Sequence, residues 1–220
     1  MTLVPVAFDH DYPDARWAYD NLNTRCKRDF PRSGKNRLLD PATCDAWQQE
    51  VSRLLDADFN YGGYLEYRGD LWRNHYHKPD AMRHLGVDYN VPAGTRVAVP
   101  AACEVIRVVR DPDQNGGWGG VVFFRLESTY KGADYFLYGH LAHDSLPEVG
   151  HFFGRGEVVG RIGVAAENGG WFPHLHVQCF TRAVYDKYAP ALEQMDGYGR
   201  NDLLERPDMP DPTELMAGLH

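Results

Sequence analysis

Short β-favouring hydrophobic runs recur through the middle of the chain, from about residue 61 to residue 183, with glycine or proline turns between them. Short strands with turn signals at this spacing are typical of an antiparallel β domain. The predicted strands are Thr95–Val99, Glu104–Val109, Val121–Leu126, Tyr135–Leu141, Val158–Ile162 and Leu175–Phe180.

Residues 1–60 follow a different pattern, which predicts a largely helical N-terminal extension. Asp40 is a favourable N-cap, and Pro41 suits the first position of a helix. One apolar face then repeats at helical spacing. It consists of Cys44, Trp47, Val51, Leu54 and Leu55. We expect this helix to brace the β domain of residues 61–183.

Residues 184–220 contain four prolines, which predict an extended C-terminal tail with at most short helices, packed on the domain. The predicted fold is therefore mainly β: an antiparallel β domain with an N-terminal helical extension and an irregular C-terminal tail. The length of 220 residues suits one domain with such extensions.

Charge and hydrophobicity exclude some functions. The formal net charge is −8, and the basic residues are scattered, which argues against a nucleic-acid partner. No stretch approaches the roughly 20 apolar residues of a membrane-spanning helix. Asp9, His10, Asp11 and Asp14 interrupt the place of a signal peptide. We therefore expect a cytoplasmic protein, with a trimmed mature form or another export route as alternatives.

The four cysteines form no Cys-x-x-Cys pair, so a cysteine zinc site is not expected. Cys103 and Cys179 lie in β-like runs and are interpreted as buried thiols. The disulfide state of the four and the oligomeric state stay open.

A first candidate site is His84-Leu85-Gly86-Val87-Asp88. Residues four apart in an extended segment point to the same side, because side chains alternate with a period of two. Val87, Tyr89, Val91 and Pro92 favour such a segment over a helix. An imidazole and a carboxylate converging from one short segment are plausible zinc ligands, although the pair alone is a weak signal.

Two further groups contain histidines in β-like surroundings. In Pro173-His174-Leu175-His176 the two imidazoles would share one strand face, with Leu175 in the core. Tyr138-Gly139-His140-Leu141 places a histidine at the end of a hydrophobic strand. Either group alone is also compatible with a structural or surface role, but together with the first they supply three ligands and two further imidazoles.

Asn115-Gly116-Gly117-Trp118 recurs as Asn168-Gly169-Gly170-Trp171. Asn-Gly and Gly-Gly favour turns because they tolerate positive φ, so two similar turns are predicted. The tryptophans either line a groove or anchor the turns to the sheet.

In the order of the chain, His-x-x-x-Asp, then Tyr-Gly-His-Leu, then Pro-His-Leu-His, the three histidine motifs resemble those of the LytM/lysostaphin-type zinc metallopeptidases. Pro92-Ala93-Gly94-Thr95 and Val158-Val159-Gly160-Arg161-Ile162-Gly163 agree with that pattern. The resemblance implies one zinc ion per chain held by His84, Asp88 and His176, and His140 and His174 as catalytic histidines. It also implies antiparallel sheets that form a substrate groove, and a peptide or peptidoglycan substrate.

The function that follows is hydrolysis of peptide bonds by a zinc-dependent endopeptidase. Zinc held by three protein ligands keeps a fourth position for water, and it lowers the pKa of that water to about 7. The stretch Ala165–Phe172 replaces the glycine-, serine- and threonine-rich segment of members that act on peptidoglycan. This difference supports one alternative, a cytosolic zinc hydrolase of a small amide. A non-catalytic regulatory scaffold is a second alternative.

Two points about the histidines stay undecided. The motif spacing does not distinguish which of His140 and His174 is the general base. His75 and His77 precede the first motif, and they form either a polar loop or a segment that blocks the zinc site.

Overall fold

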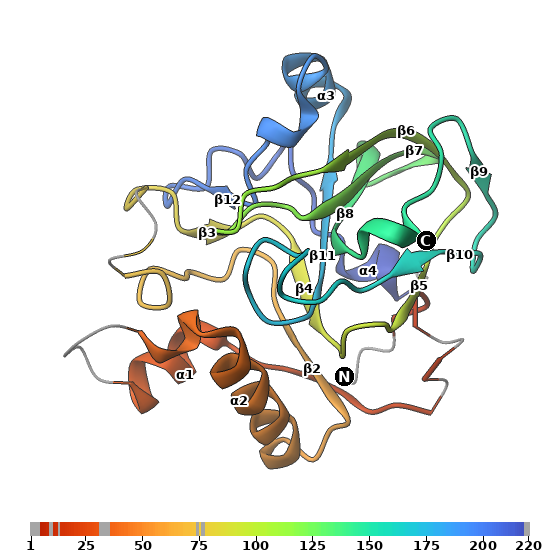
Figure 1. The fold of residues 1–220 in the computed structure, drawn as a ribbon. Coiled ribbons are helices and arrows are strands. Elements are labelled where there is room, and N and C mark those ends of the chain that lie inside the picture. Colours follow the sequence, from red (N-terminus) through yellow and green to blue (C-terminus); the bar gives the residue numbers. More distant parts are fainter. Residues whose placement is uncertain are drawn as a thin grey trace.

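The computed structural model describes residues 5–8, 11–12, 14–30, 36–73, 75 and 78–217. Its main element is an eight-stranded sheet with the order β1-β2-β4-β11-β8-β7-β6-β9. Two small sheets pair β10 with β5 and β12 with β3 (Figure 1). The strands of the main sheet are β1 (Trp17–Tyr19), β2 (Phe59–Gly62), β4 (Val87–Asn90), β6 (Cys103–Arg110), β7 (Gly120–Tyr130), β8 (Ala133–Leu141), β9 (Phe152–Phe153) and β11 (Leu175–Phe180). The small sheets comprise β3 (Arg83–His84), β5 (Arg96–Ala98), β10 (Val158–Arg161) and β12 (Tyr198–Gly199).

The helices lie at the ends of the chain or in short connections. They are α1 (Leu22–Asp29), η1 (Arg37–Leu39), α2 (Pro41–Leu54), η2 (His143–Ser145), α3 (Arg182–Tyr188), η3 (Leu192–Gln194) and α4 (Thr213–Met216). Helix α2 begins as predicted, because the Asp40 side chain accepts a hydrogen bond of 2.8 Å from the Thr43 amide. In the described part of the C-terminal tail, the helices are short, as expected, and β12 adds a two-residue strand. The mainly β class is thus confirmed.

The N-terminal segment does more than supply helices. Strand β1 pairs parallel with β2, and β2 pairs antiparallel with β4, so both strands extend the main sheet. The sheet is therefore mixed, and the prediction of a purely antiparallel domain needs that correction. A boundary after residue 60 would divide β2, and one after residue 183 would divide α3; the division into 1–60, 61–183 and 184–220 remains a proposal.

Along the central strands, successive side chains point to opposite faces of the sheet, one apolar and the other more polar. On one face of the sheet Val87, Tyr89, Leu175 and Val177 are fully or almost fully buried in a large apolar cluster. The intervening residues, Asp88 among them, point to the opposite face, as a period of two requires. That second face carries the polar residues of the candidate site.

Helices α1 and α2 lie together on one flank of the molecule, beside β2 (Figure 1). A third apolar cluster joins them to the loop around Leu71 and Trp72 and to Trp171. The Trp171 indole donates a hydrogen bond of 2.7 Å to the Leu38 carbonyl. The N-terminal segment is thus tied to a loop that also lines the candidate site.

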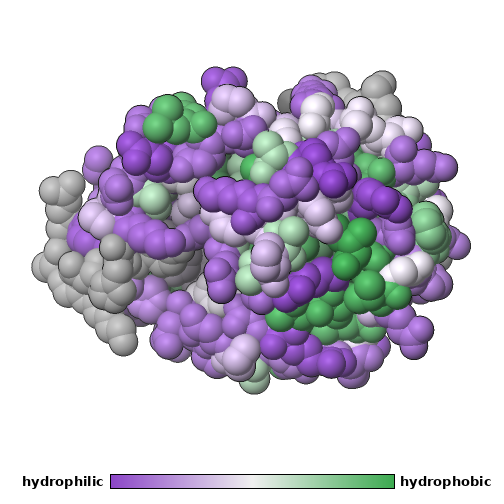
Figure 2. Space-filling view, turned by 90° about the horizontal axis from the view of Figure 1, so that it is seen from above, coloured by the Kyte–Doolittle hydropathy of each residue, from purple (hydrophilic) through white to green (hydrophobic). Residues whose placement is uncertain are grey.

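The face seen in Figure 2 is mostly hydrophilic, with a hydrophobic patch at the lower right and a smaller one at the upper left. Within the described residues, no helix combines the length and the apolar character needed to cross a bilayer. All four cysteines are buried and unpaired. Burial raises the pKa of the Cys103 thiol to about 12, so this thiol stays protonated at neutral pH.

Candidate metal centre

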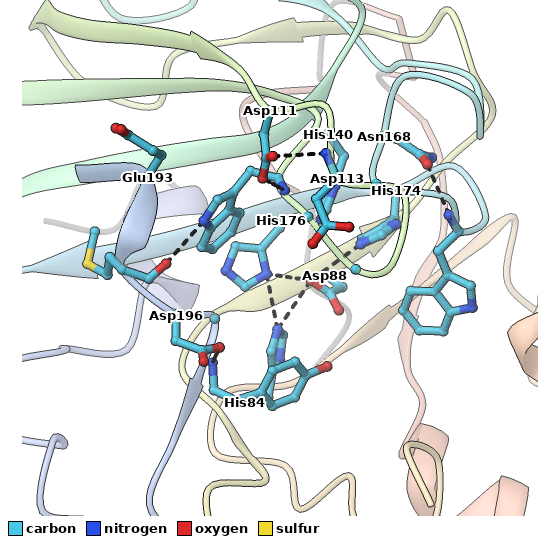
Figure 3. Close-up of a pocket in the computed structure, with 18 of the residues that line it drawn as sticks. His84, Asp88, Asp111, Asp113, His140, Asn168, His174, His176, Glu193 and Asp196 are labelled. Carbon is cyan, nitrogen blue, oxygen red and sulfur yellow. Dashed lines mark hydrogen bonds and ion pairs between the residues drawn. The ribbon is translucent and has the colours of Figure 1, made fainter. Parts of the chain in front are cut away.

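Three of the predicted residues converge on one buried point. The Asp88 carboxylate atom Oδ1 lies 2.8 Å from Nδ1 of His176 and 3.2 Å from Nε2 of His84. The two imidazole nitrogens are 3.2 Å apart. All three side chains are at most 3% exposed, and Figure 3 shows them pointing toward one another. The cluster meets the geometric requirement for a metal-binding group.

The register of the sheet explains why two of these residues meet. His176 on β11 is the direct cross-strand partner of Asp88 on β4. Side chains of directly opposed residues have Cβ atoms about 4.5–5.5 Å apart on the same face. The distant motifs are therefore joined by a single strand pairing.

His84 approaches from a different sheet. It belongs to β3, which pairs with β12, so the first motif bends at Leu85 and Gly86 instead of forming one continuous strand. A Cβ at Gly86 would collide with the Val177 carbonyl oxygen and lie 2.7 Å from the His176 ring, closer than real Cβ contacts. Glycine at this position lets the bend pass close to the imidazole, and the two residues of the motif still converge.

Hydrogen bonds to the outer nitrogens fix the protonation of both imidazoles. Nδ1 of His84 lies 3.1 Å from the Gly63 carbonyl, which can only accept, so this nitrogen carries the proton. Nε2 of His176 lies 3.2 Å from Oε1 of Gln178, and the Gln178 amide nitrogen donates to the Asp196 carbonyl. His176 is therefore protonated at Nε2. The inner nitrogen of each ring faces Asp88 with a free lone pair.

The centre thus brings together three acceptor atoms with no proton between them. Such atoms repel one another unless a cation lies among them. Zinc bonds of about 2.0–2.1 Å in tetrahedral geometry place neighbouring ligand atoms about 3.3 Å apart. The distances of 2.8–3.2 Å between the three atoms are close to this value. Two imidazoles and a carboxylate are also a ligand set that zinc favours, so the residues fit the ion.

An arginine that the sequence analysis did not identify faces the other side of Asp88. Arg68 donates from Nη1 to Oδ2 of Asp88 over 2.5 Å and from Nε to Oε2 of Glu66 over 3.2 Å. All three charged side chains are buried. Burial alone would raise the Asp88 pKa, but the attraction of His84 and Arg68 outweighs it and holds this pKa well below its usual range.

Burial and the nearby Arg68 guanidinium both disfavour a charged imidazole at His84. They lower the pKa of His84 to about 4. His84 is therefore neutral at pH 7 even in the metal-free protein, which is the state that a metal ligand requires.

His174 and His140 lie next to the three converging residues. The His174 ring donates from Nδ1 to the Phe172 carbonyl over 2.8 Å, and its Nε2 is 3.9 Å from Oδ1 of Asp88. The ring centroids of His140 and His174 are 4.2 Å apart. Burial lowers the pKa of both histidines. The structure thus brings all five predicted residues together (Figure 3).

His140 has an unusual backbone. Its φ angle is +69°, in the left-handed region that a residue with a side chain rarely adopts. Its amide donates to the Trp118 carbonyl over 2.9 Å, and its carbonyl accepts from the Gly163 amide over 2.9 Å. Strained backbone of this kind is concentrated at functional sites, where surrounding contacts maintain it.

The five residues line a pocket of about 250 Å³. Trp118 and Trp171 both form part of its wall. The two Asn-Gly-Gly-Trp turns that carry them contact each other, because the Gly116 amide donates to the Gly169 carbonyl over 2.9 Å. Gly169 has φ +84°, and a Cβ there would collide with the Gly117 carbonyl. The recurrent turns therefore form one unit beside the metal centre, and their tryptophans line the pocket.

The rim of the pocket is acidic. Its carboxylates are Asp111, Asp113, Glu193 and Asp196 (Figure 3). Glu193 is paired with Arg107 over 2.9 Å, and Asp196 with Lys78 over 2.5 Å. Asp111 accepts the Trp118 amide over 2.8 Å, so it also shapes the first turn.

Of the two upstream histidines, only His75 lies within the described residues. His75 stacks on Trp72 with ring centroids 5.8 Å apart, and it lines a neighbouring pocket. His77 lies outside the described residues. Whether this segment blocks the centre therefore stays a prediction.

Residues 82–187 match the model of peptidase family M23. This match covers just under half of the chain and confirms the resemblance seen in the sequence.

Several solved structures are similar to parts of the chain. A zinc-containing peptidase from Vibrio cholerae is 26% identical over 44% of this chain and 27% of its own, with a TM-score of 0.37. LytU is 26% identical over 47% of this chain and 66% of its own, with a TM-score of 0.38. The catalytic domain of lysostaphin from Staphylococcus simulans is 17% identical over 75% of this chain and 96% of its own, with a TM-score of 0.47.

The chain thus spans about a quarter of the Vibrio cholerae protein and just under two thirds of LytU. The comparison with curated proteins gives no match.

Proposed function

We propose that the protein is a zinc-dependent peptidase that binds one zinc ion through His84, Asp88 and His176. The observation that carries this proposal is the convergence of two unprotonated imidazole nitrogens and one carboxylate oxygen within 2.8–3.2 Å of one another. Membership of the M23 domain class supports a hydrolytic role for such a centre.

Zinc supplies a Lewis acid and makes hydroxide available at neutral pH. Around it, His174 and His140 handle protons and orient the substrate. His174 keeps its Nδ1 proton on the Phe172 carbonyl, so its Nε2 lone pair faces the centre and can accept a proton from the attacking water. The His140 ring, whose Nδ1 atom is buried, interacts with the Asn168 backbone. We assign it to orient a substrate oxygen or amide.

Peptide bonds, including those of peptidoglycan peptides, are the proposed substrates of this peptidase. A small amide is the second candidate, and the small volume of the pocket is the observation that supports it. A volume of about 250 Å³ is below the roughly 300–1,000 Å³ of most small-molecule sites. Trp118 and Trp171 form part of the wall, and the segment Glu193–Tyr198 also lines the pocket. The cytoplasmic location remains a prediction, and identifying the substrate would help to test it.

The deciding experiment combines metal analysis with mass spectrometry of purified peptidoglycan and of a panel of small amides after digestion. We expect one zinc per chain and defined products that disappear on addition of a chelator and return with zinc. His84→Ala should abolish both metal binding and products. Cleaved cell wall supports the peptidase, and cleavage of small amides alone supports the second candidate. Stoichiometric zinc without any hydrolysis would refute an enzyme and favour a regulatory scaffold.

A further inference from the structure

We propose that Arg68, supported by Glu66, is a positioning residue that makes Asp88 bind metal through a single oxygen. This inference rests on the proposed function, because it concerns how the zinc ligand is oriented. It places part of the metal centre outside residues 82–187, the segment that matches the M23 family.

The two oxygens of Asp88 have separate partners. Oδ1 faces His84 and His176 at 3.2 Å and 2.8 Å. Oδ2 accepts from Nη1 of Arg68 at 2.5 Å on the other side. A carboxylate whose second oxygen is held by a guanidinium cannot turn both oxygens toward one cation. The arrangement therefore selects one-oxygen coordination and keeps a ligand position free for water or substrate.

Glu66 holds Arg68 in place. Oε2 of Glu66 accepts from Nε of Arg68 over 3.2 Å, and its Oε1 accepts from the Asn23 amide over 2.9 Å. Asn23 lies in the first turn of α1, where free amides favour a negative charge. The Asn23 side chain also accepts from the amide of Asp70 over 2.7 Å, which fixes the loop that follows Arg68. A continuous buried path thus joins α1 to the metal centre.

The sheet leaves room for this arrangement at one glycine. Gly62 on β2 is the cross-strand partner of Asp88 on β4. A Cβ at Gly62 would collide with Nη2 of Arg68. The absence of a side chain opposite Asp88 therefore lets the guanidinium lie against the strand and reach the carboxylate.

Arg68 and Glu66 carry opposite charges, so removing both together leaves the net charge around the centre unchanged. The double variant therefore tests positioning without a change of net charge. A pair that served only to stabilise the fold would leave metal affinity and coordination unchanged when it is removed. Residues that hydrogen-bond a metal ligand usually change metal affinity by about 10–100-fold when they are substituted.

The test uses the full chain and the double variant Glu66→Gln/Arg68→Met, which removes both buried charges together and leaves neither unpaired. The matched control is Glu50→Gln/Arg53→Met, the same substitutions at an exposed pair on α2. Zinc affinity is measured by competition with a chromophoric chelator. Coordination is measured from the visible absorption of the cobalt-substituted protein. Circular dichroism of the metal-free proteins checks the fold.

We expect the double variant to bind zinc about 10–100-fold more weakly, and the control to match the wild type. The visible cobalt bands of the double variant should weaken, because Asp88 gains a second metal bond and the coordination number rises. Arg68→Lys keeps the charge but loses the two-pronged donor, so it should weaken zinc binding about threefold to tenfold. Should the double variant not fold, Arg68→Lys decides the question by the same two measurements.

Folded Arg68 variants with wild-type zinc affinity and an unchanged cobalt spectrum would overturn the inference while leaving the proposed zinc site intact. A wild-type protein that binds no zinc would overturn the proposed function and this inference with it.

Discussion

Acidification of the metal-free protein should destabilise it well before the carboxylates titrate. In the folded protein the pKa of His84 is lowered to about 4 by burial and by Arg68, whereas an unfolded chain has the ordinary value of about 6.5. Between these two values the unfolded state binds a proton that the folded state does not. Stability is therefore complete above pH 6.5 and is lost as the pH falls toward 4.

The magnitude follows from the two pKa values. They differ by about 2.5, and each unit corresponds to about 1.4 kcal/mol, so His84 alone accounts for about 3 kcal/mol between pH 6.5 and pH 4. About 2 kcal/mol of this should be lost by pH 5. The pKa values of His140 and His174 are lowered in the same direction, so they increase the loss.

Urea unfolding of chelator-treated protein at pH 7.5, 6.5, 5.5 and 5.0 measures this loss. His84→Gln should reduce the dependence of the unfolding free energy on pH by about one proton. His151→Gln, at an exposed histidine, is the control and should leave it unchanged. Equal unfolding free energies at pH 7.5 and pH 5.0 would refute the reasoning that these imidazoles are buried in the neutral form.

The other predictions concern single positions in the centre. His140→Asn, which tolerates the left-handed backbone, should keep zinc and lose about 10²–10⁴-fold in turnover, measured with any substrate found; full activity would contradict its role. His84→Ala should lose both zinc and activity, as metal analysis will report. Gly86→Ala should displace the His176 ring and lower zinc affinity at least tenfold, whereas Gly94→Ala, in open space but at a φ of +84°, should affect stability alone.

Much of the fold was predictable from local patterns. Strand β11 was predicted with the bounds that the structure has, Leu175–Phe180, because apolar residues that alternate with polar ones beside turn residues are a strong signal. Helix α2 was predicted from its Asp40 cap and Pro41. The strands β1 and β2 were not predicted, because three- and four-residue strands that pair with distant partners leave little trace in the sequence.

The residues of the candidate site were likewise predictable only in part. The five motif residues were identified because a histidine-rich pattern in a fixed order is specific even where each part is weak. Arg68 and Glu66 were missed, because a buried ion pair has no local signature and depends on pairing between β2 and β4. The only sequence hint is an acidic and a basic residue two apart after Gly62-Gly63, which would share one face of an extended segment.

The contact between the two Asn-Gly-Gly-Trp turns has an evolutionary consequence. Glycine backbone at Gly117 and Gly169 packs with no space for a side chain, so neither turn can lengthen or gain bulk alone. We therefore expect Trp118 and Trp171 to be retained or replaced together. Relatives that accept other substrates should differ at both turns simultaneously, and a chimaera that exchanges one turn without its counterpart should lose the shape of the pocket.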